Sequence, residues 1–163
     1  MVHRGPAPAR TGHRLMRRAR IARITLAATA ALALLGNGPA APDNRKIVED
    51  FARLFYVERD VKQAFETYVA PDYIQHNPGV PDGRDAAIAL LQPMFSDRTR
   101  NFEVRKILVD GDLAAIHIFA RPDPAARGAA VADFYRLKDG KIVEHWDVIQ
   151  PIPEKSANPH PMF

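Results

Sequence analysis

The sequence has 163 residues, of which 47% are hydrophobic and 26% are charged, a balance typical of one soluble globular domain. This composition excludes a disordered or collagen-like chain and argues against a membrane protein with several spans. Cysteine is absent, which excludes disulfides, thiolate catalysis and cysteine-bound zinc. The formal net charge of +4 would by itself suggest a nucleic-acid-binding protein.

The positive charge is concentrated at the N-terminus. Residues 1–42 contain seven arginines and no acidic residue, whereas residues 43–163 contain 16 basic and 19 acidic side chains. The part of the chain that can form a domain is therefore mildly acidic, and it has no basic stripe. For this reason we expect no nucleic-acid partner.

Residues 1–42 have the three zones of a secretory signal peptide. Five arginines between positions 14 and 23 are followed by the apolar stretch Ile24–Leu35 and by Gly36–Ala40, which supplies small residues before a cut after Ala40. The twelve-residue apolar stretch is too short to span a bilayer, which takes about 20 residues. We expect a secreted or periplasmic protein. One alternative is that the leader stays uncleaved and anchors the protein to a membrane, and another is that it is an organelle transit peptide. Translation could also start at Met16.

The chain after the leader begins with helical patterning. Apolar residues recur at helical spacing over residues 44–58, where Asn44 is the expected N-cap. Asp60 and Gln63 resemble a capping box and predict a second helix, which Ala70–Asp72 ends.

A short extended piece, Tyr73–Asn77, and a loop rich in Pro and Gly precede a third helix. We expect this helix over Arg84–Gln92, with Pro93 ending or kinking it. Four prolines in residues 151–163 predict an extended tail, so the domain itself is expected over residues 43–150.

From Phe102 onward the apolar residues alternate, as they do in strands. Two hairpins are predicted, one from 102–109 and 113–120 around Asp110-Gly111, the other from 129–138 and 141–149 around Asp139-Gly140. An Asp-Gly pair suits a type I′ turn, which needs positive φ at both central residues. Three helices before an antiparallel sheet predict an α+β fold with the helices on one face.

The Asp139-Gly140 turn predicts which residues share a face of the second hairpin. Counting back from the turn pairs Tyr135 with Glu144 and Asp133 with Trp146. The same count in the first hairpin brings four apolar or aromatic side chains together: Phe102, Val104, His117 and Phe119. The opposite face of the second hairpin then carries large apolar residues, Phe134, Val143 and Ile149, and predicts a homodimer through that face.

Asp133 is the most informative candidate site residue. It stands in the middle of a strand, and its predicted face carries Val131, Tyr135 and Trp146. Burial among apolar groups makes a carboxyl group a usable general acid or base near neutral pH. The alternatives are a structural ion pair and a solvated position on an outer face.

Three histidines are weaker candidates. His76 ends the short extended piece, and His117 lies in the middle of a strand, where a structural core histidine is the more frequent finding. His145 and Asp147 share a face and could imitate an iron site with two histidines and one carboxylate if a third ligand joined them. We expect no metal and no cofactor.

Two segments resemble the SnoaL-like polyketide cyclase family of the nuclear transport factor 2-like superfamily: Tyr73–Pro78 and Asp133–Asp147. The resemblance is strongest to a bacterial branch described as SnoaL-like aldol-condensation enzymes, down to Ser156–Asn158 and Met162-Phe163. It implies a cone-shaped α+β barrel, with three N-terminal helices packed on a strongly bent, mainly antiparallel sheet around a deep pocket, and it implies a dimer.

The resemblance also implies roles for particular residues. Asp133 would be the acid/base of a cofactor-free aldol reaction, and His76 and His117 would assist it in the pocket. We expect five further residues to contact the substrate: Asn77, Tyr135, Trp146, Phe102 and Phe119. Two functions stay open, namely a cyclase, isomerase or lyase acting on a small carbonyl compound, and a non-enzymatic protein that holds a small apolar or aromatic ligand.

Overall fold

The computed structural model describes residues 43–163, which form a unit of their own. The predicted signal peptide, with its cut after Ala40, lies outside the described residues. Within the described part of the chain, no helix has the length and hydrophobicity needed to cross a membrane.

Helices and strands follow one another in the predicted order. The helices are α2 (Asn44–Ala52), the π-helix η1 (Arg53–Glu58), α3 (Val61–Tyr68) and α4 (Arg84–Ser96). The strands are β1 (Val69–Gln75), β2 (Asn101–Asp110), β3 (Leu113–Arg121), β4 (Ala129–Lys138) and β5 (Lys141–Pro151). The expected tail therefore begins one residue later than predicted, because Pro151 still pairs with Ala129.

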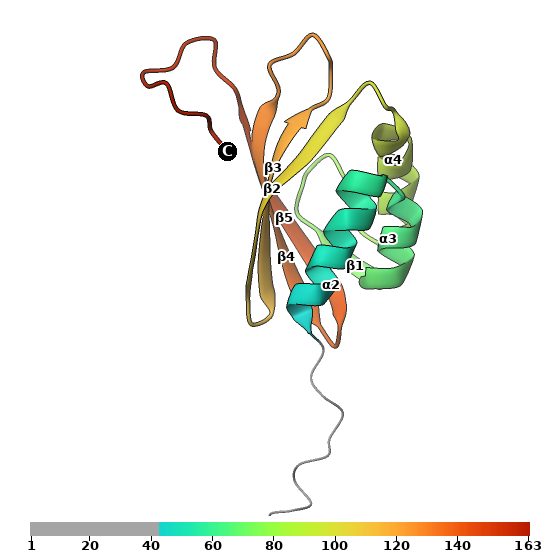
Figure 1. The fold of residues 1–163 in the computed structure, drawn as a ribbon. Helices are drawn as coiled ribbons and strands as arrows, with labels where there is room; N and C mark the ends of the chain where they lie inside the picture. Colours follow the sequence, from blue (N-terminus) through green and yellow to red (C-terminus); the bar gives the residue numbers. More distant parts are fainter. Residues whose placement is uncertain (1–42) are drawn as a thin grey trace, which may run out of the picture. The chain divides into compact units, whose positions relative to one another are not determined.

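The strands form one mixed sheet in the order β1-β5-β4-β3-β2. β1 runs parallel to β5, and the other neighbours are antiparallel. The helices cover one face of the sheet, and the C-terminal tail lies on the other side (Figure 1). The predicted α+β fold is confirmed, with the qualification that the curled sheet stays open because its edge strands β1 and β2 do not pair with each other.

The first predicted helix is interrupted by a wider turn. Asp43, and not Asn44, caps α2 by accepting a hydrogen bond from the backbone N–H of Lys46. The chain then widens into η1, where three consecutive residues are buried, namely Leu54, Phe55 and Tyr56. A regular α-helix would turn one of them toward solvent, so the π-helix allows all three side chains to be buried.

The third helix does not end at Pro93 but continues to Ser96. Phe95 supplies the physical reason, because its ring stacks on Phe55 at 4.3 Å and on Phe102 at 4.1 Å between centroids. These contacts bury Phe95 to 6% exposure. Their contribution outweighs the hydrogen bond that a proline removes from the helix.

Gly128, which precedes β4, is required for both its backbone angle and its lack of a side chain. Its φ is +90°, and an added Cβ would lie 2.5 Å from the Phe119 ring and 2.7 Å from the carbonyl oxygen of Ala120. Gly111 also has positive φ, at +58°, but a Cβ there would meet open space.

We therefore expect Gly128→Ala to be the more destabilising of two matched substitutions. Gly111→Ala should lower the free energy of unfolding by about 1–2 kcal/mol, the cost of a left-handed backbone. Gly128→Ala adds the steric clash and should cost more, as measured by urea denaturation. Equal losses in the two variants would show that the Phe119 ring moves aside freely.

Candidate functional site

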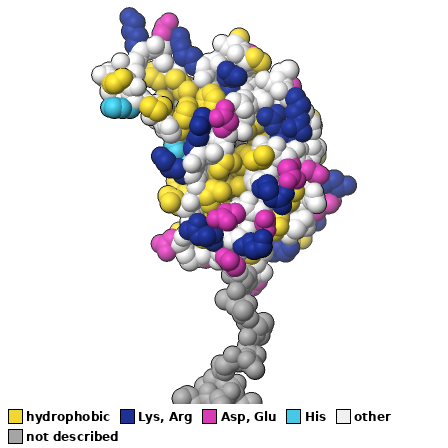
Figure 2. Space-filling model, in the orientation of Figure 1, with side chains coloured by type: hydrophobic (Ala, Val, Ile, Leu, Met, Phe, Trp, Pro, Cys, Tyr) yellow, Lys and Arg dark blue, Asp and Glu magenta, His cyan; other side chains and the backbone are white. Residues whose placement is uncertain are grey.

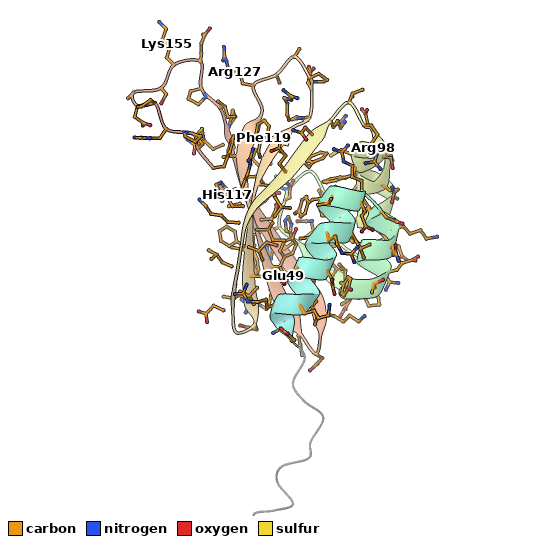
Figure 3. All side chains as sticks on the ribbon, in the orientation of Figure 1. Glu49, Arg98, His117, Phe119, Arg127 and Lys155 are labelled. Atoms are coloured by element: carbon orange, nitrogen blue, oxygen red, sulfur yellow. The ribbon has the colours of Figure 1, made fainter. Side chains whose placement is uncertain are left out.

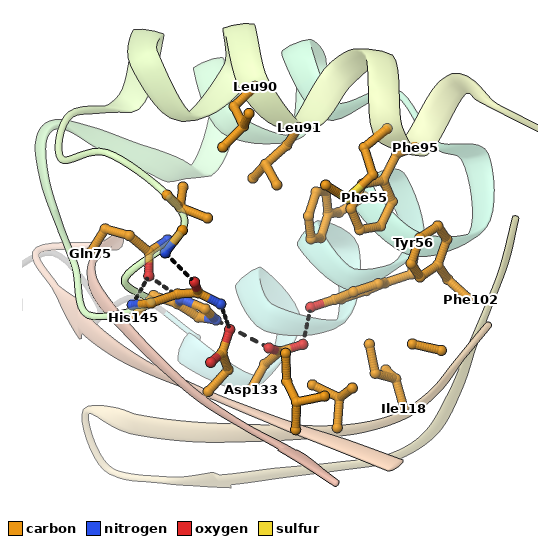
Figure 4. Close-up of a pocket in the computed structure, with 18 of the residues that line it drawn as sticks. Phe55, Tyr56, Gln75, Leu90, Leu91, Phe95, Phe102, Ile118, Asp133 and His145 are labelled. Carbon is orange, nitrogen blue, oxygen red and sulfur yellow. Dashed lines mark hydrogen bonds and ion pairs between the residues drawn. The ribbon is translucent and has the colours of Figure 1, made fainter. Parts of the chain in front are cut away.

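A cavity of about 340 Å³ lies between the helices and the concave face of the sheet. Its wall is largely aromatic and aliphatic, with Phe55, Phe95 and Phe102 near the helices and Ile118 on the sheet, whereas polar side chains gather at one end (Figure 4). The polar end is formed by Gln75, Asn77, Asp133, His145 and Asp147. A cavity of this size with a few converging polar groups is typical of a small-molecule site.

A β-bulge in β5 decides which residues reach the cavity. Lys138 pairs with Lys141 and Leu137 with Ile142, as predicted, but Arg136 pairs with Glu144 and leaves Val143 as an extra residue. Because side chains alternate between the faces of a strand, one extra residue exchanges the two faces of everything that follows.

The predicted pairs of Tyr135 with Glu144 and of Asp133 with Trp146 are therefore wrong. Tyr135 pairs with His145, and Asp133 pairs with Asp147. Asp133 lies beside Val131 and Tyr135 on the cavity face, as predicted, but the bulge adds His145, Asp147 and Ile149 to that face and turns Trp146 away. Ile149 thus lies on the cavity face and not on the outer face of the sheet, although it is 55% exposed.

The carboxylate of Asp133 is the centre of the polar end. The residue is 6% exposed, and each carboxylate oxygen has one hydrogen-bond partner. The hydroxyl of Tyr56 donates to Oδ2 at 2.6 Å, and Nε2 of His145 lies 3.1 Å from Oδ1. The hydroxyl of Tyr135 lies 2.8 Å from that of Tyr56, so that it donates to Tyr56 and extends the chain of hydrogen bonds.

Gln75 fixes the orientation of His145. The side-chain oxygen of Gln75 accepts a hydrogen bond from the backbone N–H of Asn77 at 3.0 Å, and it lies 2.7 Å from Nδ1 of His145. Since this oxygen can only accept, Nδ1 of His145 carries a hydrogen. The contact between Nε2 and Asp133 then needs one further proton, held by either partner, so the pair is neutral as a whole.

Asn77 holds Asp147 in a similar way. The backbone N–H of Gly79 donates to Oδ1 of Asn77 at 2.8 Å, which directs the amide nitrogen toward Asp147. That nitrogen donates to Oδ2 of Asp147 at 2.5 Å. One possible metal-ligand atom from each of Asp133, His145 and Asp147 lies within 4.8 Å of the others. An iron site with two histidines and one carboxylate would need a second histidine here, but the third group is the carboxylate of Asp133.

Three tyrosines of the cavity stay protonated far into the alkaline range. Burial is the main cause that raises the pKa of Tyr56 and of Tyr135 well above the ordinary 10.0, and the negative charge of Asp133 is the second. The same two causes raise the pKa of Tyr73. Each hydroxyl therefore remains protonated, and able to donate a hydrogen bond, at neutral pH.

These shifts predict alkaline unfolding. Because the folded state favours protonated Tyr56, Tyr73 and Tyr135, it binds more protons than the unfolded state above pH 10.0. Stability should be complete below that pH and fall as the pH rises above it. We expect the phenolate absorbance of these three residues to appear together with the loss of tertiary structure. Their ionisation in a protein that is still folded would contradict the prediction.

His76 and Trp146 lie outside the cavity. Nε2 of His76 is 2.8 Å from Oε1 of Glu144, and the imidazole stacks on the Trp146 indole at 4.8 Å with an angle of 6°. The hydrogen bond from His76, and then that from Arg136, lowers the pKa of Glu144. The expected places of His76 and Trp146 in the pocket are corrected. The bulge at Val143 turns Trp146 to the other face, and His76 lies between Gln75 and Asn77, which both line the cavity, so its side chain is on the opposite side.

His117 and Phe119 are also on the outer face. His117 pairs with Ala132 and its neighbour Ile116 pairs with Asp133, so His117 and Asp133 are separated by the sheet. His117 points away from the helices (Figure 3), and it lines a second cavity of about 420 Å³ together with Met162 of the tail. The Phe119 ring packs against Phe163 at 4.9 Å between centroids.

The physical reason for this second correction is the register of the first hairpin. Asp110 pairs with Leu113, so that Gly111 and Asp112 form the loop, and the register shifts again at Arg105. Phe102 consequently pairs with Ala120, and these two side chains line the cavity in place of the predicted group with His117 and Phe119.

Of the predicted site residues, the structure brings four to the cavity: Asp133, Asn77, Tyr135 and Phe102. Sequence reasoning missed Tyr56 and Gln75, and it placed His145 and Asp147 on the wrong face. The one usable signal was that His145 and Asp147 share a face, which is confirmed. No local pattern marked the partners that come from η1 and β1.

Residues 48–145 match the family model of the SnoaL-like domain, so the protein belongs to this family. No curated protein matches the sequence. Among solved structures, an NTF2-like protein of unknown function from Cytophaga hutchinsonii is 15% identical and covers 68% of this chain and 92% of its own, with a TM-score of 0.56.

Two further structures are similar to this chain. TsrD from Streptomyces laurentii is 21% identical, with coverages of 65% and 90% and a TM-score of 0.53. A protein named as a candidate SnoaL-like polyketide cyclase from Jannaschia sp. CCS1 is 14% identical, with coverages of 69% and 91% and a TM-score of 0.53. At these identities the likeness establishes the fold and no more.

Proposed function

We propose that the protein is a cofactor-independent enzyme of the cyclase, isomerase or lyase kind, which acts on a small carbonyl compound in the cavity. The observation that carries this proposal is the carboxylate of Asp133, which is buried, hydrogen-bonded by Tyr56 and His145, and located at the polar end of a largely apolar cavity. The SnoaL-like domain and its cyclase-named neighbour support the same class of reaction.

In the proposed reaction, Asp133 removes a proton from the carbon next to a carbonyl group. The C–H electron pair moves into an enolate, and the proton resides on Asp133. In an aldol reaction the enolate carbon then forms a bond to a second carbonyl carbon, whose oxygen takes up the proton. Positioned acid/base groups of this kind accelerate reactions by about 10²–10⁴-fold.

Tyr73 is the group that we assign to the enolate oxygen. Its hydroxyl accepts a hydrogen bond from Nε2 of Gln75 at 3.3 Å, so its own hydrogen is available to a ligand in the cavity. Because burial and Asp133 raise its pKa, the hydroxyl stays a neutral donor. Donors aimed at a developing oxyanion contribute about 2.7–4 kcal/mol each.

β-Tetralone in D₂O is a suitable first probe, because it is apolar, aromatic and has acidic protons next to its carbonyl. We expect the full chain to accelerate deuterium exchange at that carbon, followed by proton NMR. If β-tetralone binds in the cavity and exchange is no faster than in buffer, the enzymatic proposal is wrong.

That outcome would favour the second candidate, a protein that binds a small apolar or aromatic ligand without changing it. The extent of the aromatic wall supports this candidate. Phe55 alone contacts Phe51, Phe65 and Phe95 at centroid distances of 4.3–5.5 Å, so the wall is a packed and rigid surface.

We also propose a homodimer through the outer face of β4 and β5. Phe134 and Trp146 are paired there, and Phe134 and Val148 remain 41% and 63% exposed. Light scattering should give twice the monomer mass, and Phe134→Asp should shift the protein toward the monomer. A monomer mass for the parent protein at micromolar concentration would reject this proposal.

A further inference from the structure

The charges at the polar end of the cavity do not cancel. The Asp133–His145 pair is neutral as a whole, because the hydrogen bond between Oδ1 and Nε2 contains one proton, held by either partner, while Nδ1 donates to Gln75. Asp147 is a second carboxylate beside it, and its described partner, Asn77, is an uncharged amide. Among the described residues, those that line the cavity include no lysine and no arginine. The site therefore has one uncompensated negative charge.

Asp147 also has a carboxylate oxygen that is available to a ligand. Within residues 43–163 its side chain accepts a hydrogen bond from Asn77 alone, through Oδ2, and Oδ1 has no partner. The residue is partly buried and lines the cavity, so a bound molecule can reach that oxygen. A ligand group that donates a hydrogen bond would therefore satisfy Oδ1. A ligand group that can only accept hydrogen bonds would lie next to Oδ1 with no hydrogen between the two acceptors, which is unfavourable.

From these observations we infer that the cavity selects a ligand with an apolar, aromatic body and an ammonium or other hydrogen-bond donor directed to Asp147, and that it rejects carboxylates and phosphates. This inference rests on the proposed function only in that the cavity is taken as the ligand site. The aromatic rings of the wall act in the same direction, because the faces of aromatic rings attract cations.

Three probes with the same ring test the inference: naphthylmethylamine, naphthylmethanol and naphthoic acid. At neutral pH they are a cation, a neutral molecule and an anion of nearly the same shape. We expect calorimetric titration of the full chain to give the tightest binding for the amine, intermediate binding for the alcohol, and binding of the acid at least about tenfold weaker than that of the amine.

Asp147→Asn removes the charge and keeps the shape. In this variant we expect the preference for the amine over the acid to fall at least about tenfold, while the dissociation constant of the alcohol changes much less. Asp110→Asn is the matched control, because Asp110 is exposed at the end of β2 and does not line the cavity. It should retain the preference of the parent protein.

The outcomes separate the inference from the proposed function. If the acid binds as well as the amine, the inference is wrong although the cavity remains a ligand site. If Mn²⁺ binds the parent protein, depends on Asp147 and displaces the amine, a metal ion supplies the missing charge and the inference is also wrong. If no probe binds at all, the cavity is not the ligand site, and the proposed function fails with it.

Discussion

Asp133→Asn should abolish most of the proton exchange on β-tetralone, lowering its rate by about 10²–10⁴-fold, and should leave the fold intact. The carboxamide keeps the shape of the carboxylate but has no basic oxygen of comparable strength. The hydrogen bonds also survive, because Oδ1 of the new side chain can accept from Tyr56 while its amide nitrogen donates to Nε2 of a neutral His145.

The control for this experiment is again Asp110→Asn, which removes an exposed carboxylate outside the cavity and should keep the parent rate. Circular dichroism and the melting temperature establish that both variants are folded. If Asp133→Asn is folded and retains full exchange activity, Asp133 is not the base. A loss of stability together with unchanged activity would instead identify Asp133 as a structural partner of His145.

Phe51→Ala should have the largest effect on stability, lowering the free energy of unfolding by about 3–5 kcal/mol. Phe51 is fully buried in α2, and its ring lies 5.3 Å from that of Phe55, 5.7 Å from Phe65 and 5.4 Å from Tyr135 between centroids. Its removal therefore leaves a hole where the helices meet the sheet, next to the residues that carry the cavity.

The comparison for Phe51 is Val57→Ala, a truncation only six positions further along the same helical segment. Val57 is 62% exposed, and its loss should change the free energy of unfolding by no more than about 0.5 kcal/mol. Urea denaturation measures both variants. A loss below about 1 kcal/mol for Phe51→Ala would mean that the surrounding rings close the hole, and that the aromatic wall is less rigid than proposed.

Local chemistry explains what could be predicted from the sequence. Asp60 caps α3 through the backbone N–H of Gln63, as its sequence pattern predicts. Asp139 and Gly140 adopt φ values of 50° and 75°, the positive angles that a type I′ turn requires. Such features depend on residues that are close in the chain, so the elements and the α+β fold followed from them.

The faces of the strands could not be predicted in the same way. A single extra residue, Val143, exchanges the two faces of β5 beyond it, and nothing in the local alternation of side chains marks a bulge. The expected pocket therefore contained Trp146, which lies on the outer face. The register shift at Arg105 has the same effect in the first hairpin, so the expected pocket also contained His117 and Phe119. The position of Asp133 was predicted correctly because it is on β4, where buried and less buried residues alternate without interruption over residues 131–138.

The sequence by itself determined the order of helices and strands, the two hairpins and the presence of a carboxylate on the inner face of β4. Only the tertiary structure decided which groups surround that carboxylate. The π-helix places Tyr56 beside Asp133, and the parallel pairing of β1 with β5 places Gln75 beside His145. The bulge in β5 turns His145 and Asp147 to the same face. Capping and turn geometry depend on a few adjacent residues, whereas these contacts join residues up to 77 positions apart and form only when the sheet packs against the helices.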